Sequence, residues 1–162
     1  MQDQVEQGVV EGRQGLTAYR ATGAVQAVPF LCTLLAEAYD RLGQPEDGLR
    51  ALAEAQTLVE QHDERWWEAE IHRLRGVVLL RQLEPQQQEA EACFQQALDV
   101  ARRQEAKTLE LRAARSLARL WQQQGKRAAA RELLAPIYGW FTEGFDTADL
   151  QEAKTLLEEL AG

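Results

Sequence analysis

Hydrophobic residues recur along the chain at intervals of three and four positions, the spacing that places them on one face of an α-helix. Strict alternation of polar and apolar residues, which is typical of half-buried strands, is almost absent. Short polar stretches separate the hydrophobic runs, so we expect short connections and antiparallel neighbouring helices. The pattern predicts an all-α chain with helices at residues 3–22, 27–42, 45–62, 66–82, 86–104, 106–124, 127–143 and 147–161.

A second pattern returns about every 40 residues. Its first copy has a leucine, an alanine and a tyrosine before a turn glycine, and its last copy repeats this with tryptophan in place of tyrosine. These residues are Leu35, Ala36, Tyr39 and Gly43 in the first copy and Leu117, Ala118, Trp121 and Gly125 in the last. Such fixed-period similarity predicts stacked helix pairs, and it favours binding along a surface over chemistry in a closed pocket.

Small and large residues alternate in a way that suits close helix packing. We expect the small ones where the two helices of a unit cross, and the large ones in the space between units. The small residues are Gly48, Ala55, Ala90, Ala97 and Ala130, and the large ones are Tyr39, Leu52, Leu79, Phe94, Trp121 and Leu134.

This arrangement resembles the tetratricopeptide repeat (TPR) over residues 29–141. The resemblance implies a right-handed α-solenoid of antiparallel helix pairs, with about eight helices. It divides the chain into an N-terminal half-repeat helix (1–23), three TPR-like repeats (24–63, 64–104 and 105–143) and a C-terminal capping helix (144–162). The second repeat departs from the family pattern, because Leu83 replaces the turn glycine and His72 stands where the family often has tryptophan.

Three sequence segments resemble a particular group of repeat proteins. They are Leu34–Tyr39, Trp66–Glu70 and Leu117–Arg127. They are similar to the C-terminal repeat regions of large bacterial signalling regulators, which also carry an ATPase module and often a nucleotide cyclase or DNA-binding domain. The resemblance implies a fragment of a bacterial regulator, but it transfers no catalytic activity to this chain.

The first predicted helix corresponds to the second helix of a repeat whose first helix is missing. At the 40-residue period, Gly8 aligns with Gly48 and Gly15 with Ala55. Two explanations remain open: the chain is cut from a longer array, which we favour, or the lone helix acts as a cap. Three glycines, including Gly12, weaken this helix by roughly 1 kcal/mol each relative to alanine, so we expect residues 3–12 to fray.

The composition limits the function classes. A net charge of −8 argues against general nucleic-acid binding, which needs a basic face. No run of residues is long and apolar enough to span a membrane, and the N-terminus lacks a secretory signal pattern, so we expect a cytoplasmic chain. Cys32 and Cys93 each lie in an apolar helical pattern and are expected to be reduced core residues.

No catalytic, metal-binding or cofactor-binding constellation stands out, and we expect the chain not to be an enzyme. His62 and His72 lie on different predicted helices without further ligands at a suitable spacing. Neither cysteine has a neighbouring base that would activate it. The aromatic pair Trp66–Trp67 is interpreted as packing, with one ring between units and the other over a helix start.

The TPR resemblance implies that the first helix of each unit lines a concave surface. It places Phe30, Thr33, Glu37, Asp40 and Arg41 there from the first unit; Glu70, Arg73, Val77, Leu80 and Arg81 from the second; and Arg112, Arg115, Arg119, Gln122 and Gln123 from the third. The three arginines of the third unit, the arginine stripe, are spaced by three and four and so share one helix face. Two sources of compensating negative charge remain open. One is Glu70 of the preceding unit, and the other is an acidic partner.

The sequence thus predicts a non-catalytic interaction module that binds a short segment of a protein, or of another domain, in its concave groove. An acidic segment is favoured. The expected contact residues are Arg73, Arg81, Arg112, Arg115, Arg119, Gln122, Glu37 and Asp40. The first alternative is a sensor for a small anionic effector. The second is self-association through the half-repeat, in a chain that we otherwise expect to be a monomer or weakly self-associating.

Overall fold

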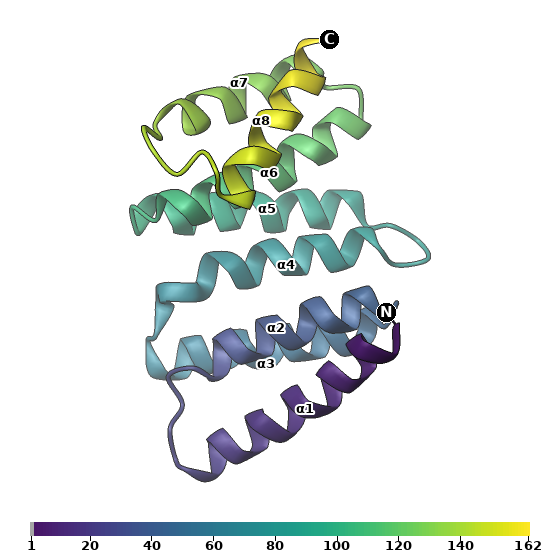
Figure 1. Cartoon of the computed structure of the whole chain (residues 1–162), viewed down its shortest axis with the longest axis vertical. Helices are drawn as coiled ribbons and strands as arrows, with labels where there is room; N and C mark the ends of the chain where they lie inside the picture. The colour runs from purple at the N-terminus through teal and green to yellow at the C-terminus, as the bar shows by residue number, and fades with distance from the viewer. Residues whose placement is uncertain (1) are drawn as a thin grey trace.

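The computed structural model describes residues 2–162, and over this range the chain is all-α, as predicted (Figure 1). A short 3-10 turn precedes the fourth α-helix. The helices are α1 (Gln2–Ala21), α2 (Val28–Arg41), α3 (Pro45–His62), α4 (Glu68–Leu80), α5 (Gln87–Arg103), α6 (Lys107–Gln123), α7 (Arg127–Gly139) and α8 (Ala148–Ala161), with the 3-10 turn η1 at Arg65–Trp67.

Consecutive helices pack in pairs, and the pairs stack into an elongated molecule (Figure 1). The pairs α2/α3, α4/α5 and α6/α7 form three units, while α1 packs on α2 at one end and α8 packs on α7 and α6 at the other. The first helices of the units, α2, α4 and α6, also contact one another in sequence, and we call the surface they form the inner face. This is a solenoid-like all-α fold; its right-handed sense stays a prediction.

The core runs the length of the stack in two main clusters. One cluster is formed by α1 to α4 and the other by α4 to α8. The small residues predicted at the helix crossings are all buried, and Gly76 marks the closest approach, since a Cβ there would lie 2.5 Å from the ring of Phe94. The small residues are therefore buried as the sequence indicated, while Phe94, expected between units, lies against Gly76 of its own unit.

Helix ends agree with the prediction at most positions. Gly43 and Gly125 take the left-handed conformation, with φ of 69° and 77°. The turns after α3 and α5 instead use Asp63 and Glu105, both at φ 55°, which no sequence signal marked. These four residues close turns on both edges of the stack.

The predicted end of the seventh helix is wrong. Helix α7 ends at Gly139 rather than at residue 143. Pro136 lies inside its last turn, where it removes a backbone donor, and the glycine that follows favours an end to the helix. Residues 140–143, which were expected in this helix, instead belong to the connection to α8.

The outer face of α1 is polar and rich in glycine. No atom outside the helix would lie within 4 Å of a Cβ at Gly8 or Gly15, whereas one at Gly12 would touch Leu35 of α2. Val10 is its one exposed large hydrophobic residue among those whose side chains are described. The face that a missing helix would cover is therefore open but not apolar. None of the described helices is long and apolar enough to cross a membrane.

Candidate functional site

The structure brings the predicted contact residues together on the inner face. They lie on three neighbouring helices: Glu37 and Asp40 on α2, Arg73 on α4 with Arg81 just after its end, and Arg112, Arg115, Arg119 and Gln122 on α6. The family resemblance therefore placed these side chains on a common surface. What it did not identify is the negative charge that faces them.

Helix α8 supplies that charge. Arg112 donates from Nε to Oδ2 of Asp149 at 2.8 Å, and Arg115 lies 2.8 Å from Oε2 of Glu152. Arg119 pairs with Glu159 further along the same helix. All three arginines of the stripe thus meet acidic residues of the last helix, which lies across α6 (Figure 1).

Glu70, the internal partner that the sequence suggested, is also used. Its carboxylate lies 3.6 Å from Arg112, which confirms the predicted bridge between units. Its shorter contact, at 2.6 Å, is with Arg73 on its own helix, and Arg73 in turn lies 3.8 Å from Glu37 of α2. Although burial disfavours the charge of Arg73, its hydrogen bonds to Glu70 raise the pKa of the guanidinium. A ladder of alternating charges thus runs from α2 to α8.

A second, shorter ladder lies at the other end of α2. Nε of Arg81 lies 3.2 Å from Oδ2 of Asp40. Burial raises the pKa of Asp40, against the opposing effect of Arg81, and its other oxygen, Oδ1, is buried without a hydrogen-bond partner.

Gln122 accepts a hydrogen bond from Arg119 at 3.1 Å and donates one to Glu159 at 3.2 Å. Each predicted contact residue is therefore engaged within the chain.

Helix α8 is a fixed wall of the groove. Its apolar stripe, Leu150, Ala153, Leu156 and Leu160, is buried against the second core cluster. Burial of a leucine side chain contributes about 1.5–3 kcal/mol, so the three leucines contribute roughly 5–9 kcal/mol to holding α8 in place. A short ligand that displaced α8 would have to offset this energy, so α8 keeps its acidic residues beside the arginine stripe in the folded chain.

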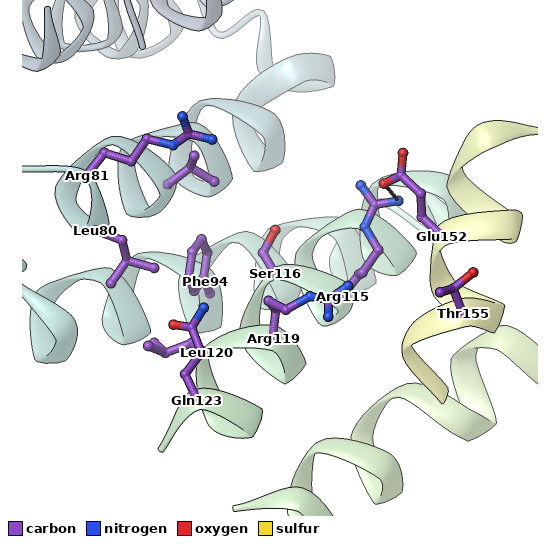
Figure 2. A pocket seen from close by; sticks show the side chains of 11 residues that line it. Leu80, Arg81, Phe94, Arg115, Ser116, Arg119, Leu120, Gln123, Glu152 and Thr155 are labelled. Atoms are coloured by element: carbon purple, nitrogen blue, oxygen red, sulfur yellow. Dashed lines mark ion pairs between the residues drawn. The ribbon is translucent and has the colours of Figure 1, made fainter. Parts of the chain in front are cut away.

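Two adjoining cavities open on the inner face between these charges. The first has a volume of about 530 Å³ and an apolar floor that includes Val77, Leu80 and Phe94. Figure 2 shows Arg115 and Glu152 facing one another at one side of this cavity, with Leu80 and Phe94 on the other. Its lining therefore combines apolar surface with charges that are already paired.

The second cavity, of about 380 Å³, lies toward the beginning of the same helices and shares Arg115 with the first. Its wall on α2 and η1 combines the apolar side chains of Phe30, Leu34 and Trp67 with the polar ones of Thr33 and Glu37. The opposite wall is the charge ladder. We call the two cavities together the inner groove.

The histidines and cysteines form no further site. Among the described residues no three metal-ligating side chains cluster. His72 is buried, which lowers its pKa, and its Nε2 lies 3.9 Å from Glu68. Both cysteines are free and buried as predicted, and burial raises the pKa of Cys93 and that of Cys32, the latter to about 11. Thiols of this kind are poor nucleophiles at neutral pH.

The acidic face of α8 was missed, although the sequence carries a signal for it. Asp149, Glu152 and Glu159 are spaced by three and seven and so share one helix face. An acidic face of this kind can pair with a stripe of basic residues on a neighbouring helix. The spacing of its apolar residues indicates which face of α8 enters the core. It does not indicate that the acidic face of α8 lies against α6.

Compared with protein-family models and with curated proteins, the sequence gives no match. The resemblance to the tetratricopeptide repeat, and to the repeat regions of bacterial regulators, therefore stays a prediction that rests on the residues quoted above. The assignment of a function depends on the groove itself.

Proposed function

We propose that the chain is a non-catalytic interaction module that holds a short segment of a partner protein, or of another domain of its own protein, in the inner groove. The observation that carries this proposal is the pair of adjoining cavities on the inner face, about 530 and 380 Å³ in volume, each lined by both apolar and charged side chains. Apolar surface of this kind favours burial of partner side chains, and the rim fixes their orientation.

A binding role fits the chemistry of the groove better than a catalytic one. Its arginines and carboxylates hold one another in ion pairs, which leaves no strong base or nucleophile aimed into the cavities. A place in the cytoplasm, within a larger signalling regulator, accords with the resemblance to bacterial repeat regions and belongs to the same proposal.

The preference for an acidic partner loses its main support. That preference rested on unpaired positive charge in the arginine stripe, and Asp149, Glu152 and Glu159 now supply the opposite charge. A small anionic effector, the alternative, faces the same competition, since every arginine of the groove already holds a carboxylate. Self-association through α1 has little apolar surface to drive it.

Selection of peptides from a random displayed library against the full chain tests the proposal. We expect selected peptides to bind in the groove, so that Val77→Trp, which fills the first cavity, weakens their binding about tenfold or more. The matched control is Ala92→Trp, at an exposed position of α5 that lines neither cavity. Circular dichroism confirms that both variants fold.

Peptides that bind the two variants equally well would place the binding site elsewhere and refute the proposal. A library that yields no binding peptide would do the same. Chemical conversion of a bound peptide by the chain would contradict the proposal that the module is non-catalytic.

A further inference from the structure

Exposed apolar side chains gather at one end of the inner groove. Trp66 of η1 is 51% exposed and Leu34 of α2 is 47% exposed. The ring of Phe30 lies 6.2 Å from that of Trp66 and 5.3 Å from that of Trp67. We call these four residues the aromatic patch; three of them line the second cavity.

The patch is held in place by the fold. The indole N–H of Trp67 donates to the hydroxyl of Thr33 at 2.9 Å, and this hydroxyl donates to the carbonyl oxygen of Phe30 at 2.6 Å. Trp66 stacks on the ring of Phe30, which fixes it over the same surface. The sequence-based interpretation of the tryptophan pair as packing therefore describes Trp67, while Trp66 keeps half of its surface open.

The most exposed charged group that lines the second cavity is negative. Glu37, one turn along α2 from Leu34, has a side chain that is 38% exposed and only a long contact, 3.8 Å, to Arg73. Arg73 itself is 12% exposed and already bound to Glu70. The carboxylate of Asp63, 82% exposed, lies three residues before Trp66 and pairs with Arg65, 49% exposed, at 2.6 Å, so these two charges offset one another.

The rest of the groove adds no free positive charge. Each of its arginines (Arg73, Arg81, Arg112, Arg115 and Arg119) has a carboxylate within 4.0 Å. The whole chain has a net charge of −8, which steers basic partners toward it and repels acidic ones.

We propose that the aromatic patch docks an apolar side chain of a basic partner segment, an aromatic or leucine residue with a lysine or arginine beside it that reaches Glu37. The inference rests on the proposed function and names its partner chemistry. The apolar side chain covers Phe30, Leu34 and Trp66, and the cation lies against the carboxylate. Aromatic anchors in such partly preformed sites account for most of the binding energy of an interface.

Isothermal titration of three probe peptides into the full chain tests this inference. The basic probe has a phenylalanine and a leucine spaced one helical turn apart and flanked by lysines. The acidic probe replaces the lysines with glutamates, and the polar probe replaces the two apolar residues with serines. We expect measurable binding of the basic probe alone.

The variants locate the binding. Trp66→Ala and Leu34→Ala each weaken the basic probe about tenfold, and Glu37→Gln weakens it about threefold. Leu83→Ala and Trp140→Ala are matched controls, because these side chains, 105% and 58% exposed, do not belong to the aromatic patch and line neither cavity of the groove. They leave the affinity unchanged. All five side chains are at least partly exposed, so the variants are expected to fold.

Tighter binding of the acidic probe, or equal losses in the control variants, would overturn the inference. Binding of library peptides that Val77→Trp abolishes but Trp66→Ala and Leu34→Ala leave intact would overturn it as well, while the proposed function would stand. Failure of every peptide to bind in the groove would instead refute the proposed function.

Discussion

Replacement of Asp149 by alanine removes one of the three carboxylates that tie α8 to the arginine stripe, the one in contact with both Arg112 and Arg115. Oδ2 of Asp149 accepts a hydrogen bond from Arg112 at 2.8 Å, and Oδ1 lies 3.4 Å from Nη1 of Arg115. The residue also stands in the first turn of α8, near the positive end of the helix dipole. The change therefore leaves two half-buried guanidinium groups with fewer partners.

The expected cost follows from these contacts. A hydrogen bond between charged groups contributes about 1.5–3 kcal/mol when it is shielded from water, and the dipole adds about 0.3–1 kcal/mol. Partial exposure of the pair and the better helix propensity of alanine reduce the sum. Arg112 keeps Glu70 at 3.6 Å and Arg115 keeps Glu152 at 2.8 Å. We expect Asp149→Ala to lower the free energy of unfolding by about 2 kcal/mol, or the melting temperature by about 4–8 °C.

Urea denaturation followed by tryptophan fluorescence measures this change. The matched control is Glu158→Ala on the same helix, which removes an exposed pair at 3.9 Å from Lys154 and should cost at most about 0.5 kcal/mol. The effect of Asp149→Ala should shrink in the background of Arg112→Ala, because the two residues share one interaction. Equal effects of Asp149→Ala and Glu158→Ala would show that α8 is held by its leucines alone and would refute this reasoning.

Two further predictions concern the core. Gly76→Ala should lower the free energy of unfolding by about 1–3 kcal/mol, because the new Cβ would lie 2.5 Å from the ring of Phe94. Gly8→Ala, with open space around the new Cβ, should raise the free energy of unfolding by up to about 1 kcal/mol. Denaturant midpoints compare the two variants, and a stabilising effect of Gly76→Ala would contradict the close approach of Gly76 to Phe94. Burial lowers the pKa of His72 below its ordinary value of 6.5, so the unfolded chain binds a proton more readily than the folded one. The free energy of unfolding should therefore fall as the pH drops below about 6.5, by at most about 1.4 kcal/mol per pH unit for this group. His72→Gln should reduce that slope, and a slope equal to that of the unaltered chain would exclude His72 as the cause.

Much of the fold follows from the sequence because its signals are local and repeated. The period of three and four residues gives the helices, and turn glycines such as Gly43 and Gly125 give their ends. Small residues at fixed positions in each unit give the crossings. These features depend on neighbours in the chain or one unit away, which a repeat pattern makes visible.

The features that sequence reasoning missed depend on contacts that no repeat position encodes. Asp149 meets Arg112 across 37 residues, because α8 lies across α6. The exposure of Trp66 depends on how η1 folds against α2, and a 3-10 turn of three residues has no clear periodic signal. Sequence reasoning therefore identified the arginine stripe correctly as a set of residues on one helix face. It could not decide whether the negative charge opposite the stripe comes from the chain itself or from a ligand.

The four tryptophan indoles offer the most direct test of where the chain binds a partner. Their N–H signals in a nitrogen–proton correlation spectrum report separate places. Trp66 and Trp67 lie in the aromatic patch, Trp121 donates to Glu91 at 2.8 Å and lines neither cavity of the groove, and Trp140 lies beside Lys107. During titration with the basic probe, the signals of Trp66 and Trp67 should shift in a saturable way while those of Trp121 and Trp140 stay fixed. Uniform shifts of all four signals, or shifts confined to Trp121 and Trp140, would contradict the account.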